Sequence, residues 1–173
     1  SPLTNCFPEG GTSTALFVQA RSGLPQGTFI YARGYATNMY GTAYSPDTTF
    51  TTYAPPTITT PTVAQVTNGG AVLGATITSN GGSAILARGT CFATTPAPST
   101  NCIVEGGTAV SSFTHTRTGM TPNTTYYYRG YATNAYGTSY SADDSTTTLP
   151  NLTNVTVTPG NTQARVDYIT TAS

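Results

Sequence analysis

Residues 127–148 read YYRGYATNAYGTSYSADDSTTT, and residues 31–52 read YARGYATNMYGTAYSPDTTFTT. The two stretches lie 96 residues apart, and the same register extends back to NCIVEGG at 101–107 and NCFPEGG at 5–11. Counted from the first residue, 27 of the 52 aligned positions are identical. Self-similarity of this extent at a fixed spacing indicates a tandem repeat.

The repeat predicts three parts in the chain. We interpret residues 1–54 as the C-terminal half of a repeat, residues 55–150 as a complete repeat, and residues 151–173 as the N-terminal strands of a further repeat. A complete repeat is long enough to bury a modest core of its own. We expect Ser1 to be a processed end or a cut through a longer chain. A longer covalent chain accounts for the two partial repeats better than strand donation between free copies, which would leave a sheet edge open.

Turn signals divide the complete repeat into short strands. Asn and Gly at 68–70 and 80–82 are typical of tight hairpins, because both residues accept a positive φ. The predicted strands span 61–67, 71–79, 84–93, 108–116, 124–133 and 138–148. Alternation places on one face of the third strand Ile85, Ala87, Gly89 and Cys91. The pattern predicts an all-β fold of tandem antiparallel sandwiches.

The charge composition narrows the classes of partner. Charged residues make up only 7% of the chain, and six basic residues balance six acidic ones. A net charge of zero provides no electrostatic basis for binding nucleic acid or an anionic membrane surface. No apolar stretch approaches the ~20 residues of a membrane span. We expect a surface that contacts other protein, since so few charges give a free monomer little colloidal stability.

One stretch carries a family resemblance. MTPNTTYYYRGYATNAYG at 120–137 has an apolar residue, Pro, Thr and Tyr at alternate positions, followed by an alternating strand that ends Ala-x-Asn-x-x-Gly. This pattern resembles the fibronectin type III signature, and the wider repeat is similar to those of large bacterial surface proteins. The resemblance implies tandem Greek-key sandwiches of fibronectin type III or immunoglobulin-like type, with partial repeats at both ends.

The resemblance also implies a role for Tyr126. It would be a tyrosine corner, whose hydroxyl bonds to nearby backbone and stabilises the fold locally. Ile30 occupies the matching position in the first copy, and the chain lacks the tryptophan that is usual in the family. The family's implied roles are adhesive, spacer or structural, and none is specified by the fold alone.

The three cysteines predict one disulfide. Cys91 and Cys102 both lie in the complete repeat, and closing the loop between them would contribute ~2.5–3 kcal/mol in the chain-entropy model. A redox or metal role would need more ligands, and His115 is the only histidine. Cys6 matches Cys102 in register, so we expect it to pair outside this stretch of sequence or with another copy. A disulfide indicates an oxidising, extracellular setting.

A candidate contact surface alternates along the strand at 124–133. Tyr127, Arg129 and Tyr131 share the face opposite Tyr126, and the first copy repeats them as Tyr31, Arg33 and Tyr35. Three interpretations remain open: a self-contained ladder on the outer face of the sheet, a contact with a neighbouring subunit, or a glycan-binding stripe.

Catalytic, metal and cofactor sites are not expected. His115 matches Gln19 in the other copy, and Glu105 matches Glu9, so neither position forms a constellation within one repeat. The adjacent pair Asp143 and Asp144 falls short of the six or more oxygens of a calcium site. The sequence therefore predicts a protein that is not an enzyme.

Two hypotheses of function follow. The first is a structural segment of a long extracellular repeat protein or filament, such as a surface fibre or adhesin stalk, whose partners are further repeats or other copies arranged head to tail. The second is a carbohydrate-binding accessory module of a secreted enzyme or adhesin, with glycans as partners. An open, flat stripe of Tyr127, Arg129 and Tyr131 would favour the second, and a stripe engaged within the protein would favour the first.

Overall fold

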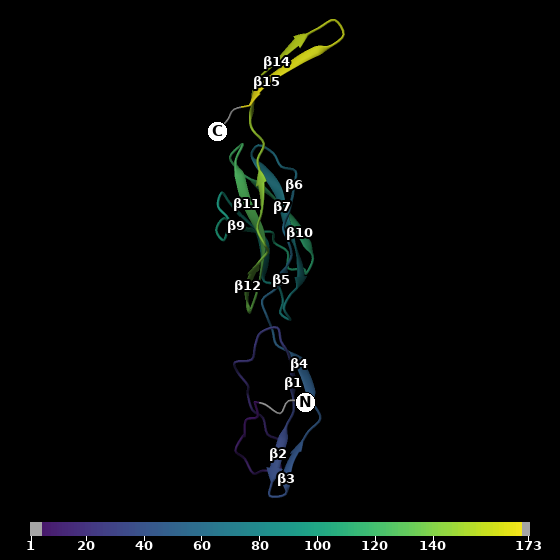
Figure 1. Ribbon diagram of the computed structural model, residues 1–173, viewed down its shortest axis with the longest axis vertical. Helices are drawn as coiled ribbons and strands as arrows, with labels where there is room; N and C mark the ends of the chain where they lie inside the picture. The colour runs from purple at the N-terminus through teal and green to yellow at the C-terminus, as the bar shows by residue number, and fades with distance from the viewer. Residues whose placement is uncertain (1–4, 171–173) are drawn as a thin grey trace. The chain divides into compact units, whose positions relative to one another are not determined.

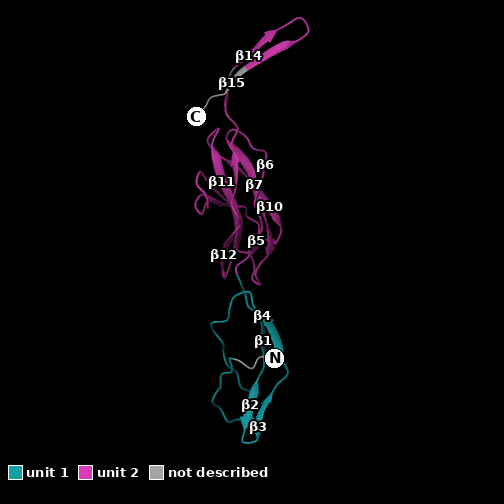
Figure 2. Cartoon of the chain, in the orientation of Figure 1, with its two compact units in different colours: residues 1–54 teal, residues 55–173 magenta. Residues whose placement is uncertain are grey.

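The computed structural model describes residues 5–170, and the regular structure found there is β-strand throughout. The chain divides into two compact units, residues 1–54 and 55–173 (Figure 2). The division falls where the sequence repeat also places a boundary. Within the described part of the chain, no helix is long and apolar enough to cross a bilayer.

The first sheet of the second unit is organised around β7. Its strands are β5 (Thr57–Ile58), β6 (Thr62–Ala64), β7 (Gly70–Ser79) and β10 (Ser112–Thr118). β7 pairs antiparallel with β10 along one edge and with β5 and β6 along the other (Figure 1). Leu73, Ala75 and Ile77 of β7 are all buried, as their shared face predicts.

The second sheet is organised around β11. Its strands are β8 (Ala87–Ala93), β9 (Cys102–Val104), β11 (Thr125–Asn134), β12 (Gly137–Tyr140) and β13 (Asp144–Thr147). β11 pairs with β8 on one edge and with β12 and β13 on the other, and β9 pairs with the far edge of β8. All of these pairings are antiparallel.

The order of the strands defines the fold. Along the chain, β5, β6 and β7 enter the first sheet, β8 and β9 enter the second, β10 returns to the first, and β11, β12 and β13 complete the second. Crossing between sheets in this way gives an antiparallel Greek-key sandwich of fibronectin type III-like arrangement. Both the predicted fold class and the fold implied by the sequence resemblance are confirmed.

The core lies between the two sheets. One cluster joins Leu73 to Phe92 and Tyr128, and the other joins Ile77 to Phe113. Full burial of a side chain of this size contributes roughly 1.5–3 kcal/mol. The sheets approach closely at Gly130, where an added Cβ would lie 2.3 Å from the Cβ of Ala75. Gly130 is therefore required by packing.

Part of the predicted pattern for the third strand is wrong. β8 begins at Ala87, so alternation does not extend back to Ile85, which packs between the sheets with Phe113. Phe92 lies in the core, and Cys91 therefore faces the outer side. Ile85 and Cys91 do not share a face.

Other strand predictions also differ from the structure, and the strand predicted at 108–116 is β10 at Ser112–Thr118. The strand predicted at 61–67 shortens to β6, with β5 before it. β9 is a three-residue strand that the sequence pattern misses. The strand predicted at 138–148 is divided into two strands, β12 and β13. Between them the hydroxyl oxygen of Ser141, in place of a backbone carbonyl, accepts a hydrogen bond from the N–H of Gly130 at 3.0 Å.

The first unit reproduces the latter half of the complete repeat at 55–150. Its strands are β1 (Phe29–Ala32), β2 (Tyr35–Asn38), β3 (Gly41–Tyr44) and β4 (Thr48–Thr51). β1 pairs with β4 and β2 with β3, which matches the pairing of β11 with β13 and β12. Side-chain hydrogen bonds repeat too: Asn38 accepts from the backbone of the β2–β3 turn as Asn134 does after β11.

The interior face of this half-sandwich is uncovered. Phe17 is 51% exposed, whereas its register partner Phe113 is 5% exposed. Leu24 is 39% exposed, whereas Met120 is 4% exposed. The repeated side chains thus meet solvent in one unit and form a core in the other.

The last described strands form a hairpin. β14 (Leu152–Pro159) pairs antiparallel with β15 (Ala164–Thr170). Val157 lies opposite Val166 on one face, while Thr158 lies opposite Arg165 on the other. These two strands fall within the segment for which the sequence predicts the start of a further repeat, and residues 171–173 of that segment lie outside the described residues.

Candidate functional site

The outer face of β11 carries the tyrosine–arginine ladder, defined as Tyr127, Arg129 and Tyr131. Tyr128 points into the core, so alternation turns the ladder to the other side of the sheet. Across the strand pair, Arg129 lies opposite Cys91 and Tyr131 opposite Gly89. A Cβ on Gly89 would lie 2.0 Å from the carbonyl oxygen of Ile103 in β9 and 2.9 Å from the Tyr131 ring, so both the neighbouring strand and the aromatic side chain need a glycine here.

Arg129 is engaged within its own unit. Its Nε donates to the carbonyl oxygen of Pro98 at 2.7 Å, and its guanidinium stands 4.0 Å from the centre of the Tyr140 ring. Asp143 lies 4.0 Å from Nη1. Tyr131 is buried and packs near Tyr140, with ring centres 6.3 Å apart. The ladder is therefore packed into the sheet, and its middle residue is largely covered.

The first unit repeats this arrangement. The guanidinium of Arg33 stands 4.1 Å from the centre of the Tyr44 ring, and Asp47 lies 3.9 Å from its Nε. The rings of Tyr35 and Tyr44 are 6.2 Å apart. Tyr31 differs, because it is exposed and packs edge-on against Phe29. Arginine, tyrosine and aspartate thus form the same packing unit in both halves of the chain.

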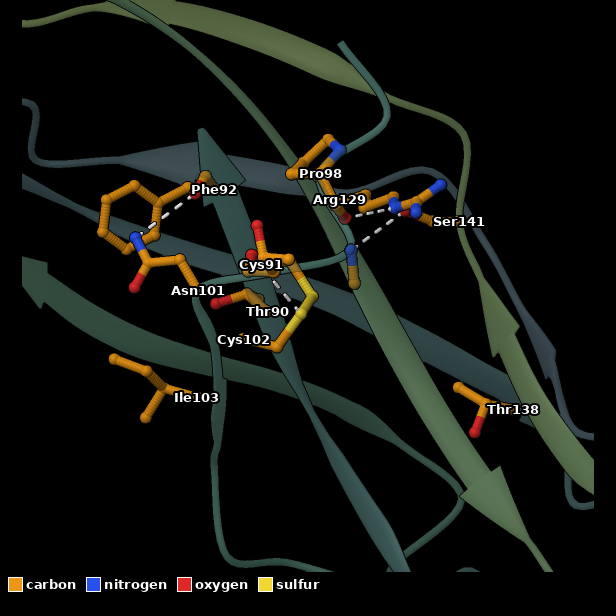
Figure 3. Close-up of a disulfide and its surroundings, with 12 residues drawn as sticks. Thr90, Cys91, Phe92, Pro98, Asn101, Cys102, Ile103, Arg129, Thr138 and Ser141 are labelled. Carbon is orange, nitrogen blue, oxygen red and sulfur yellow. Dashed lines mark hydrogen bonds between the residues drawn. A yellow bond between two sulfur atoms is a disulfide. The ribbon is translucent and has the colours of Figure 1, made fainter. Parts of the chain in front are cut away.

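The disulfide supports the loop that covers the ladder. Cys91 and Cys102 are joined, as the sequence predicts, and link β8 to β9 at directly opposed positions (Figure 3). The loop that they close contains Pro98, whose carbonyl accepts from Arg129. Asn101 also holds the loop, donating to the carbonyl oxygen of Phe92 at 3.3 Å. Cys6, the matching cysteine of the first unit, is exposed.

The two neighbouring aspartates have separate structural roles. Asp143 accepts from the backbone N–H of Ala97, in the same disulfide-closed loop. Asp144 accepts from the hydroxyl of Tyr128 at 2.9 Å. Burial raises the pKa of Tyr128, and the hydrogen bond to Asp144 raises it further. In the part of the chain that the structure describes, no group of three or more His, Cys, Asp or Glu is placed to hold a metal ion.

Tyr126 makes the backbone contact that the resemblance implies. Its hydroxyl accepts from the N–H of Thr121 at 3.0 Å, and its ring packs edge-on against Phe92. This bond ties the turn before β11 to the strand itself. Ile30, at the same position of the first unit, has no hydroxyl with which to do so.

Two arginines in the interior were not singled out from the sequence. Arg117 is 1% exposed, and its Nη2 donates to the carbonyl oxygens of Thr90 at 2.8 Å and Ile103 at 2.9 Å. Burial lowers the pKa of this guanidinium. Arg88 bonds Glu105 at 2.7 Å, and this hydrogen bond lowers the pKa of the carboxyl group. Arg117 thus links β10 to β8 and β9, and Arg88 links β8 to the segment between β9 and β10.

A signal for the interior arginine does exist in the repeat. Arg21 matches Arg117 in register, and its Nη2 donates to the carbonyl oxygen of Phe7 at 3.2 Å. Phe7 in turn matches Ile103, so the same bond recurs in the first unit. There Arg21 stays exposed. An arginine retained in both copies of an otherwise uncharged segment indicates a backbone-binding role.

Comparison with known proteins bears on the fold alone. No protein-family model and no curated protein matches the chain. The chain is similar to a crystal structure of a segment of titin, at 20% identity and a TM-score of 0.40, over 66% of this chain and 39% of that chain. It is also similar to a crystal structure of the FN1–FN3 domains of chicken CNTN1, at 19% identity and a TM-score of 0.36, over 83% of this chain and 52% of that chain. The chain spans 39% and 52% of those two lengths, so its function is inferred from its own residues.

Proposed function

We propose that the chain is a non-catalytic structural segment of an extracellular repeat protein or filament, such as a surface fibre or adhesin stalk. The observation that carries this proposal is the internal engagement of Arg129. Arg129 donates a hydrogen bond to Pro98, stacks on Tyr140 and lies near Asp143. These contacts hold the loop that contains Pro98 against the second sheet. A side chain committed in this way serves architecture, and the repetition of the packing unit in the first half of the chain supports the same role.

The proposed setting is outside the cell, and the proposed partners are further repeats of the same protein arranged head to tail. The disulfide between Cys91 and Cys102 supports an oxidising compartment. The low charge of the surface supports packing against protein of the same kind. Tandem sandwiches linked end to end are a common way to build extended extracellular proteins.

Antibody labelling of native material tests this role. An antibody raised against residues 55–150 is expected to decorate fibres or the outer surface of intact cells at regular intervals. Labelling that requires permeabilised cells, with none on extracellular structures, would contradict the proposal. An antibody preabsorbed with the same fragment is the control.

Glycan binding is the competing function, and one feature favours it. A shallow hollow of about 270 Å³ lies beside Tyr127 and is lined by Pro96, Tyr127, Asp143, Asp144 and Ser145. Small-molecule sites usually exceed about 300 Å³, and both aspartates already accept internal hydrogen bonds. A glycan array probed with the chain decides between the functions. Binding that is lost in Tyr127→Ala, but kept in the matched variant Tyr31→Ala, would favour the carbohydrate-binding module.

A further inference from the structure

The first unit presents an apolar face whose counterpart within the second unit is covered by strands β6 and β7. In the second unit, Met120 packs with Leu73 of β7, and Phe113 lies on β10 beside β7 and packs with Ile77. The register partners of these two residues, Phe17 and Leu24, are 51% and 39% exposed. The same internal face therefore exists twice in the chain and is covered once.

The edge that this hairpin would join is also open in the first unit. In the second unit, β10 pairs with β7 over seven residues, from Ser112 opposite Thr76 to Thr118 opposite Gly70. The matching residues 16–22 pair with no strand among the described residues. Leu16 and Val18 are exposed on this segment. Both the face and the edge thus fit an added antiparallel strand.

The hairpin of β14 and β15 has the complementary form. Val157 lies opposite Val166, in the arrangement of Val63 opposite Leu73 in the β6–β7 pair. Leu73 is fully buried, whereas Val157 and Val166 are 59% and 56% exposed. On the opposite face, Thr156 lies opposite Asp167 and Thr158 opposite Arg165, and Arg165 donates to Asp167 at 2.8 Å. Ile169 is the exposed apolar residue that follows them on that face. This hairpin therefore has one apolar face suited to a core and one mainly polar face.

We propose that the β14–β15 hairpin of a second copy of the chain packs on the open face of the first unit, with Val157 and Val166 against Phe17 and Leu24 and with β15 paired to residues 16–22. This proposal rests on the proposed structural function and names the partner of the first unit. Two uncovered, complementary surfaces on one chain favour a second copy as the occupant. The hairpin brings no counterpart of β8, so one edge of the completed sandwich stays unpaired.

The geometry of this contact determines the assembly. Each chain donates through its hairpin and receives through its first unit, so the two surfaces of one contact are different. Contacts of this heterologous kind produce rings where the rotation closes and open filaments where it does not. Head-to-tail growth through a noncovalent contact is the consequence, as the alternative to the longer covalent chain that the two partial repeats predict.

Self-association of the 173-residue chain tests the proposal. Light scattering across a dilution series is expected to show masses that rise with concentration in steps of 17.9 kDa. The donor variant Val157→Thr with Val166→Thr keeps shape and strand propensity, and it is expected to weaken association at least about tenfold. The control, Thr156→Ser with Thr158→Ser, changes the polar face and is expected to associate as the unaltered chain does.

Mixing the two halves of the contact sharpens the test. The receiver variant Phe17→Ala with Leu24→Ala keeps its hairpin surface but loses the surface of its first unit, so it is expected not to associate alone. The donor variant keeps its first unit and loses its hairpin surface. A mixture of the two variants is therefore expected to form a complex of two copies and no larger species. A peptide of residues 151–170 in excess is expected to lower the mean mass of the unaltered chain. This peptide experiment needs no folded variant.

The outcomes are distinct from those of the proposed function. A chain that stays monomeric at every concentration, or a donor variant that associates as well as its control, would overturn the proposal. A longer covalent chain that supplies these strands from a preceding repeat would give the first result together with antibody-labelled fibres, and the structural role would stand. Self-association in solution without extracellular labelling would instead support the contact and contradict the role.

Discussion

Gly130 and Gly34 offer a matched pair of substitutions, since they hold the same register position in the two halves of the chain. At Gly130 an added Cβ would lie 2.3 Å from the Cβ of Ala75 and 3.0 Å from Cδ1 of Ile58. At Gly34 an added Cβ would meet Cζ of Phe17 at 3.5 Å and Oγ of Ser45 at 3.8 Å. The first position requires the sheets to separate, and the second permits ordinary van der Waals contact.

The expected effects of alanine at these positions have opposite signs. Overpacking costs about 1–3 kcal/mol, and replacing glycine inside a strand returns about 0.5–1 kcal/mol. Gly130→Ala is therefore expected to lower the free energy of unfolding of the second unit by about 1–2 kcal/mol. Gly34→Ala is expected to leave stability unchanged or to raise it by up to about 1 kcal/mol.

Urea unfolding followed by circular dichroism measures the free energy, and hydrogen exchange of β7 amides assigns the change to the second unit. A loss of about 1 kcal/mol would lower the melting temperature of a domain of this size by roughly 4–8 °C. Equal effects of the two substitutions would refute the reasoning, because they would mean that both faces are packed alike.

Three further predictions concern the second unit. Tyr126→Phe removes the acceptor of the Thr121 N–H and is expected to cost about 1–3 kcal/mol in urea unfolding, against little change for Tyr127→Phe on the outer face; equal costs would remove the tyrosine corner from the account. Replacing Cys91 and Cys102 together by serine is expected to cost about 2.5–3 kcal/mol and to speed hydrogen exchange in the 92–101 loop, and an unchanged melting temperature would contradict a stabilising disulfide. Because the hydrogen bond with Arg88 lowers the folded-state pKa of Glu105, its contribution is present above the unfolded-state pKa and is lost as the pH falls through the folded-state value. As the pH is lowered, the free energy of unfolding is thus expected to fall less steeply in Glu105→Gln than in the control Glu9→Gln. The same pH dependence in both variants would show that the Arg88 contact does not stabilise the fold.

Much of the sandwich follows from alternation in the sequence. Successive side chains of a strand point to opposite faces of the sheet, so a strand with one face in the core and one face outside shows a period of two in its residue types. β11 is long enough to display that period, and the sequence correctly places Tyr127, Arg129 and Tyr131 on the face opposite Tyr126, which lies in the core. β9 has three residues, too few for any periodic signal. Its pairing with β8 is instead anchored by Cys102 opposite Cys91.

Other features depend on tertiary contacts that local pattern does not encode. The break between β12 and β13 arises where the Ser141 hydroxyl replaces a backbone acceptor, and Ser45 makes the same bond to Gly34 in the first unit. The displacement of Ile85 from the outer face of β8 depends on where that strand begins. The burial of Arg117 depends on the carbonyls of Thr90 and Ile103, which belong to strands distant in sequence.

The ladder illustrates the same limit for function. Alternation identified which face Tyr127, Arg129 and Tyr131 share, and three uses of that face remained open. What distinguishes them is the loop that carries Pro98, since its carbonyl engages Arg129. The conformation of that loop depends on the disulfide and on Asn101, neither of which follows from strand periodicity.

Hydrogen exchange in the dilute chain tests most directly whether one sandwich is closed and the other open. Two matched sets of backbone amides are compared. The first set is the amides of β11 that donate to β12 and β13. The second set is the amides at the same repeat positions of β1 and β2, which donate to β4 and β3. The β11 amides are expected to exchange only with global unfolding of their unit, which takes about 5–15 kcal/mol in typical domains, while the β1 and β2 amides exchange through low-energy local opening. Equal protection of the two sets in the monomer would contradict the account.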